Sequence, residues 1–90
     1  LFSGTKAWIS STKSITGHEI WMAGASEVVY CTIMMQNKFI APSINIETID
    51  SCATGLQIAQ KTIHIPLNII LSNSFGFGGT NCSIVLKKTT

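Results

Sequence analysis

The order of hydrophobic and polar positions predicts one long helix in the first half of the chain. Between Glu19 and Asn37, apolar residues recur three and four positions apart, which is the spacing of a helix. Apolar residues also occupy much of the opposite side, as in a buried helix. Lys38 follows at the negative pole of the helix dipole, and Pro42 prevents any continuation.

Two further patterns predict strands in the second half. Residues 67–72 are nearly all apolar, as in a strand that is covered on both faces, and residues 82–87 form a second strand. The nine residues between them, Asn73–Asn81, are long for a hairpin connection, which usually has two to five. The remaining segments are interpreted as a strand end, a polar turn, a loop and a stretch without assignment: residues 7–11, 12–18, 41–54 and 55–64.

Composition excludes several broad classes of protein. With 46% hydrophobic residues the chain is not disordered. No apolar run approaches the ~18 residues of a membrane span. Arg is absent and the six Lys are scattered, which argues against a nucleic-acid surface.

The charged fraction indicates that the chain is a piece of a larger protein. Only 11% of the residues are charged, against about 25% in an ordinary soluble domain. A domain of this size buries only about 60–65% of its unfolded surface, so its apolar remainder is expected to meet missing protein. The first residue is Leu1, and no signal peptide pattern follows it.

The three cysteines predict reduced, mostly buried thiols in a cytosolic protein. Their number is odd and no C-x-x-C pair occurs among Cys31, Cys52 and Cys82. A zinc site would need His18 or His64 at spacings that match no usual pattern. His64 is interpreted as a surface or strand-edge residue, and no cysteine is expected to be a nucleophile.

The glycine-rich segment allows two interpretations. Gly76 and Gly78 fit the start of a phosphate-binding G-x-G-x-x-G, but Asn81 replaces the third glycine and a strand follows, which disfavours that site. The segment is either a tight reversal that uses positive φ or, because Phe75 and Phe77 alternate with glycine, a gate or a donor of backbone N–H groups.

Lys13, His18 and Glu27 form the second candidate constellation. His18 lies where the predicted helix begins, and the helix dipole there favours a neutral imidazole that can donate one hydrogen bond, although Glu19 opposes this effect. A buried Glu27 would need a partner, and Lys13 is the nearest cation in sequence. The alternatives are an exposed Glu, a solvated Lys and a His in a capping region.

The two segments together resemble a known family. Ser11–His18 is similar to the S-x-K-x-x-x-G-H segment of the beta-ketoacyl-acyl-carrier-protein synthases, and Asn73–Asn81 to their N-S-F-G-F-G-G-x-N loop. The resemblance extends from about Ile9 to Lys88. Residues 39–47 are most similar to the type I synthases.

The resemblance implies an α/β fold, namely the C-terminal portion of a thiolase-like fold. It would contain a strand end, a buried helix, a loop and the final two antiparallel strands of a mixed sheet. Residues 1–90 would be the C-terminal part of a beta-ketoacyl synthase C-terminal domain, with the upstream half absent.

The implied activity belongs to fatty acid biosynthesis. It is a decarboxylative Claisen condensation of an acyl thioester with malonyl-acyl-carrier protein, and its product is 3-oxoacyl-acyl-carrier protein. The implied partners are acyl carrier protein and the remainder of the polypeptide, in a cytoplasmic homodimer without cofactor, metal, membrane or nucleic acid. The nucleophilic Cys and the first His would lie upstream, so this chain alone is expected to be inactive.

The resemblance also implies a role for individual residues. His18 would hydrogen-bond the malonyl thioester carbonyl, with Lys13 as its support and Glu27 as the acidic partner of that lysine. Ser72 and Asn73, with Glu27, would line a small cation or water site.

In the glycine loop, the N–H of Phe77 would complete an oxyanion hole. The rings of Phe77 and Phe75 would gate the acyl pocket, on a backbone that Gly76 and Gly78 make flexible.

One segment departs from the family pattern. Ile20-Trp21-Met22 stands where small residues are expected, so Trp21 is predicted to overpack the helix start, at about 1–3 kcal/mol. This departure motivates a second hypothesis, a non-catalytic partner subunit or decayed homologue. A small phosphate-binding module is a third.

Overall fold

A computed structural model describes residues 1–89, which divide into two compact units of mixed α/β structure. The first unit combines residues 1–17 and 40–63, and the second combines residues 18–39 with the chain from 64 onward. The strands form pairs rather than one broad sheet: β1 with β3, β2 with β4, and β5 with β6.

Hydrogen bonds between serine side chains and the backbone connect separate segments of the first unit. β1 (Trp8–Ile9) pairs in parallel with β3 (Gln57–Ile58), and Ala59 beyond it is fully buried. Ser43 Oγ accepts from the Ser11 amide at 2.9 Å, and Ser14 Oγ accepts from the Ile44 amide at 2.9 Å. Ser10 donates to the carbonyl of Ala41. These bonds satisfy backbone groups that the two-residue strands leave unpaired.

Several segments of this unit are more regular than the sequence predicted. The polar turn is helical over α1 (Lys13–Thr16), and Gly17 ends this helix with a φ of 78° and an N–H bond to Lys13. The loop contains a 3-10 turn, η2 (Ser51–Ala53). The unassigned stretch supplies β3 and β4 (Ile63–His64), and β4 pairs with β2 (Phe39–Ile40).

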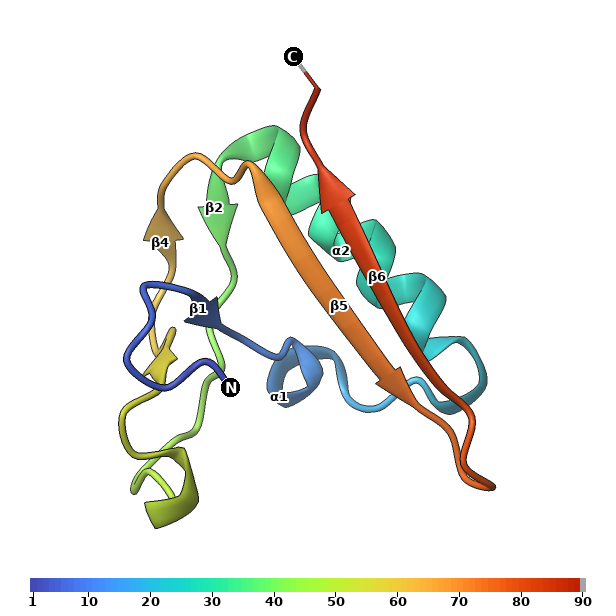
Figure 1. The fold of residues 1–90 in the computed structure, drawn as a ribbon, viewed down its shortest axis with the longest axis horizontal. Helices are drawn as coiled ribbons and strands as arrows, with labels where there is room; N and C mark the ends of the chain where they lie inside the picture. The colour runs from blue at the N-terminus through green and yellow to red at the C-terminus, as the bar shows by residue number, and fades with distance from the viewer. Residues whose placement is uncertain (90) are drawn as a thin grey trace. The chain divides into compact units, whose positions relative to one another are not determined.

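The second unit is a helix on a hairpin, which confirms the two predicted strands (Figure 1). β5 (Ile69–Phe75) and β6 (Asn81–Lys87) are antiparallel, with Phe75 opposite Asn81. The expected nine-residue connection was too long, because Asn73–Phe75 and Asn81 are paired strand residues. Only residues 76–80 form the loop, which is an ordinary hairpin length.

The long helix ends as predicted and begins later. α2 (Ala23–Asn37) follows a 3-10 turn, η1 (Ile20–Met22), instead of starting at Glu19. It ends at a left-handed Lys38, whose N–H donates to the Met34 carbonyl. α2 packs along β5, as Figure 1 shows, with Gly24 close to Ser74.

The hairpin is covered on one face only, which corrects the expectation of a strand buried on both. Alternate residues of β5 are half-buried and exposed, with Ile70, Ser72 and Ser74 on the half-buried face. Large apolar side chains are exposed elsewhere in this unit: Val29, Ile33, Ile69, Leu71, Phe75, Ile84 and Val85. Among residues 1–89, Met35, Ile40 and Ala59 are the buried hydrophobic residues.

No helix within residues 1–89 is long and apolar enough to cross a membrane.

Candidate functional site

His18 is oriented by a hydrogen bond within its own turn. It is the first residue after Gly17, is exposed, and its Nδ1 accepts the Ile20 N–H at 2.9 Å. An imidazole nitrogen that accepts a hydrogen bond carries no proton, so the neutral ring has its proton on Nε2. The turn therefore leaves Nε2 as the ring nitrogen that can donate a hydrogen bond, and the role of His18 as a neutral donor stays a prediction.

The hydrogen bond to His18 comes from a residue with an unusual backbone, Ile20. This residue has a φ of 51°, in the left-handed region that β-branched residues rarely adopt. Such a conformation costs roughly 1–3 kcal/mol and persists only where neighbouring contacts hold it. A strained residue therefore lies two positions from the candidate catalytic group.

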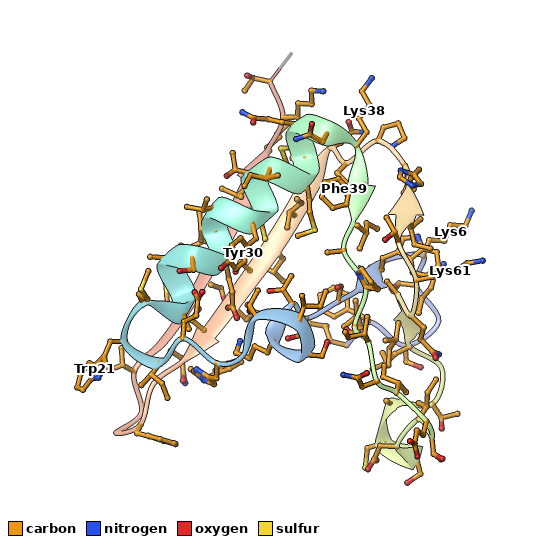
Figure 2. All side chains as sticks on the ribbon, turned by 180° about the vertical axis from the view of Figure 1, so that it is seen from behind. Lys6, Trp21, Tyr30, Lys38, Phe39 and Lys61 are labelled. Atoms are coloured by element: carbon orange, nitrogen blue, oxygen red, sulfur yellow. The ribbon has the colours of Figure 1, made fainter. Side chains whose placement is uncertain are left out.

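The prediction that Trp21 crowds the start of the helix is wrong. Its side chain is 99% exposed and stands away from the second unit in Figure 2. The 3-10 turn η1 directs it outward, so within residues 1–89 it overpacks nothing.

Glu19 links the His18 turn to α2, a connection that sequence reasoning missed. The Tyr30 hydroxyl donates to Glu19 Oε1 at 2.8 Å, across eleven positions of sequence. Hydrogen bonding by the buried Ser26 and then by Tyr30 lowers the pKa of Glu19, and the bond to Glu19 raises the pKa of Tyr30. Glu19 beside a candidate histidine was a visible signal, but no spacing rule points from it to Tyr30.

Lys13 and Glu27 belong to different units of the structure. Lys13 is the first residue of α1 and Glu27 lies on the half-buried side of α2. Their pairing, and their support of His18, stay predictions.

The glycine loop is held by its own backbone. The Gly76 amide donates to the Thr80 carbonyl at 2.7 Å, and the Gly79 amide donates to the Gly76 carbonyl at 3.2 Å. Gly78 and Gly79 have φ values of 98° and 96°, which glycine adopts without strain.

Phe77 is the exposed tip of this loop. Its ring is fully exposed, and its N–H donates to no acceptor within residues 1–89. The loop is thus a tight reversal, as the first interpretation had it, and it also offers the unpaired N–H that the second one needs.

Ser72 and Asn73 do not converge on one point. They are adjacent residues of β5, so their side chains lie on opposite faces of the strand, with Ser72 on the half-buried face. Asn73 Oδ1 accepts from Ser83 at 2.7 Å. Residues 1–89 contain no group of three metal-binding side chains, and the cation or water site stays a prediction.

The cysteines are free, but two of them are exposed, contrary to the prediction of mostly buried thiols. Cys52 lies in the surface turn η2, and Cys82 lies in β6, where its side chain is exposed. Cys31 is half-buried, and burial raises the pKa of its thiol, which argues against a nucleophile. His64 is exposed at the end of β4, as predicted.

Residues 2–47 match the family model described as "Beta-ketoacyl synthase, C-terminal domain". This chain belongs to that family. The matched region contains Lys13, His18 and Glu27, whereas the glycine loop lies beyond it. The family resemblance that the sequence predicted is confirmed.

Three relatives extend the similarity over nearly the whole chain, and each is named 3-oxoacyl-(acyl-carrier-protein) synthase 1. The protein of Buchnera aphidicola subsp. Schizaphis graminum is 54% identical over 97% of this chain and 21% of its own length. That of Haemophilus influenzae is 53% identical over 89% of the chain and 20% of its length. That of Escherichia coli K12 is 47% identical over 98% of the chain and 22% of its length. The chain thus spans about a fifth of these relatives.

Proposed function

We propose that this chain is the C-terminal part of a condensing enzyme of fatty acid biosynthesis. The whole enzyme would join an acyl thioester to malonyl-acyl-carrier protein with loss of carbon dioxide and release 3-oxoacyl-acyl-carrier protein. The membership in the synthase family and the names of the relatives support this reaction class.

The observation that carries the proposal is the hydrogen bond from the Ile20 amide to His18 Nδ1. It leaves Nε2–H as a neutral donor to the malonyl thioester carbonyl. When the carboxylate leaves as carbon dioxide, its bonding electrons form the enolate, and negative charge grows on that oxygen. A donor already in place stabilises this charge more than the ground state, and so lowers the barrier.

The glycine loop would serve the other thioester. In this proposal, the Phe77 N–H donates to the oxygen of the acyl group held on an upstream cysteine. The free amide at the loop tip supports this role, because a donor engaged within the loop could not bind an oxyanion. Lys13 and Glu27 would hold the surroundings of His18, and homodimer formation remains a prediction from the family.

A chimera tests the proposal directly. Residues 1–90 would replace the corresponding segment of the Escherichia coli relative, and malonyl-carrier decarboxylation and condensation would be measured separately. We expect both reactions to occur, and His18→Ala to lower the decarboxylation rate about 100- to 1,000-fold, as for loss of one oxyanion donor.

His64→Ala is the matched control, since His64 is an exposed histidine at the end of β4. We expect it to leave both rates within twofold. A folded chimera without turnover would instead support the non-catalytic homologue. Equal rates for His18→Ala and His64→Ala would contradict the role of His18.

A further inference from the structure

Glu19 is the residue whose contacts the proposed reaction leaves unexplained. It lies between His18 and Ile20, and its side chain turns back to α2 rather than into solvent. There the hydroxyl of Tyr30 donates a hydrogen bond to Glu19 Oε1 at 2.8 Å. A hydrogen bond to a charged carboxylate is stronger than one between neutral groups. The carboxylate therefore fastens a short exposed turn to the helix that follows it.

The backbone geometry connects this carboxylate to the imidazole. The direction of the Ile20 N–H depends on the peptide plane between residues 19 and 20, which is set by ψ of Glu19 and φ of Ile20. These angles are 8° and 51°. Because the second angle is strained for isoleucine, the turn would relax to another conformation without an anchor.

From this geometry we infer that Glu19 is a positioning residue for His18. Its hydrogen bond to Tyr30 holds the strained peptide plane, so that the Ile20 N–H stays on Nδ1 and the proton stays on Nε2. The inference rests on the proposed function and deepens it, because it names the groups that keep the proton of His18 on Nε2. It extends the candidate site beyond residues 13, 18 and 27 to a residue of the second helical turn of α2.

Substitutions can separate the hydrogen bond between Glu19 and Tyr30 from the charge of Glu19. Glu19→Gln keeps an oxygen that accepts from Tyr30 but removes the charge, whereas Glu19→Ala removes both. Tyr30→Phe removes only the Tyr30 donor and leaves the hydrogen bonding of Ser26 to Glu19. Glu47→Gln is the matched control, because it neutralises an exposed carboxylate of the first unit.

The experiment uses the full-length synthase that carries this chain, with 15N-labelled histidine. The nitrogen shifts of His18 report which ring nitrogen bears the proton, and this readout does not require turnover. We expect wild type, Glu19→Gln and Glu47→Gln to show a protonated Nε2 alone. Glu19→Ala and Tyr30→Phe should show a mixture of both tautomers.

The kinetic readout is the decarboxylation of malonyl-carrier. We expect Glu19→Ala to lower kcat about tenfold with KM unchanged, since a hydrogen bond to a charged group is lost. Tyr30→Phe should have a smaller effect in the same direction, and Glu19→Gln should restore kcat to within about threefold of wild type.

Two results would overturn the inference. One is a single Nε2–H tautomer in Glu19→Ala. The other is an equal loss in Glu19→Gln and Glu19→Ala, which would assign the effect to charge. If wild type shows the expected tautomer but no decarboxylation, the proposed function fails while the positioning of His18 by Glu19 stands.

Discussion

The turn after His18 and the loop at Phe77 both need left-handed backbone, and they obtain it in opposite ways. The loop uses glycine at positions 78 and 79, where φ near 97° involves no Cβ. The turn uses Ile20 at 51° and holds it with side chains. The loop is thus defined by its backbone alone, whereas the orientation of His18 depends on particular side chains of this chain.

This difference predicts that backbone changes matter most at Phe77. In the full-length enzyme, Phe77→Pro removes the free amide, and we expect it to lower kcat for condensation about 100- to 1,000-fold. Phe77→Ala keeps the amide and removes the ring, so it should lower kcat less than tenfold and alter the preference for acyl chain length. Steady-state kinetics with carriers of different acyl length would measure both. Equal losses in the two variants would show that the ring, and not the N–H, is the functional group.

The second prediction concerns the glycines of the same loop. Replacing Gly78 and Gly79 together by Ala forces two Cβ atoms into left-handed backbone, and should destabilise the loop by about 2 kcal/mol. We expect condensation to fall about 30-fold, because the Phe77 amide would be misdirected in most molecules. Gly79→Asn is the control, since asparagine tolerates positive φ better than alanine. A double alanine variant with normal kinetics would contradict the view that the loop depends on glycine.

Replacing Ile20 by glycine should relieve the backbone strain at this position. Ile20→Gly should raise the stability of the full-length protein by about 1 kcal/mol, because glycine adopts positive φ freely. Ile15→Gly is the matched control: Ile15 is also exposed but lies in α1, where glycine should destabilise by up to about 1 kcal/mol. Thermal unfolding midpoints would compare them. A lower midpoint for Ile20→Gly would show that the isoleucine side chain contributes more than its backbone conformation costs.

The sequence predicted the two regions unequally, for a physical reason. Glycine and aromatic spacing in residues 73–81 indicated either a reversal or a gate or donor of backbone N–H groups, because those properties are local. The assignment to the Phe77 N–H came from the family resemblance. The helix end at Asn37 and the two strands were also visible in local patterns. The bond from Tyr30 to Glu19 was not, because eleven positions separate them and a 3-10 turn displaces the start of α2.

The exposed apolar residues show that the local sequence pattern did not predict burial correctly. A pattern of apolar residues on both sides of α2 and β5 predicted burial, yet Val29, Ile33 and Leu71 are exposed. Periodicity reports which residues favour burial but not which part of a polypeptide buries them. The chain spans about a fifth of its relatives, and the expectation that missing protein meets these faces stays a prediction.

A second carboxylate, Asp50, also holds a turn, but it lies outside the candidate site. Its Oδ1 accepts from the Cys52 amide at 2.8 Å at the start of η2. Hydrogen bonding by the Cys52 backbone, and secondarily by its side chain, lowers the pKa of Asp50. Since the folded-state pKa lies below the unfolded one, this cap stabilises the turn above about pH 4 and is lost as pH falls through the folded value.

We therefore expect Asp50→Ala to speed hydrogen exchange of the amides of residues 51–53 a few-fold at pH 7, relative to intrinsic rates. As the pH falls through the folded-state pKa of Asp50, the variant and wild type should approach each other, because the protonated carboxyl caps poorly. The condensation rate should be unchanged both in the chimera and in the full-length enzyme. Glu47→Ala is the control for removing an exposed carboxylate. If Asp50→Ala impaired condensation as much as Glu19→Ala, fastening a turn with a carboxylate would be a general requirement of this fold, and the Glu19 contact would have no special relation to His18.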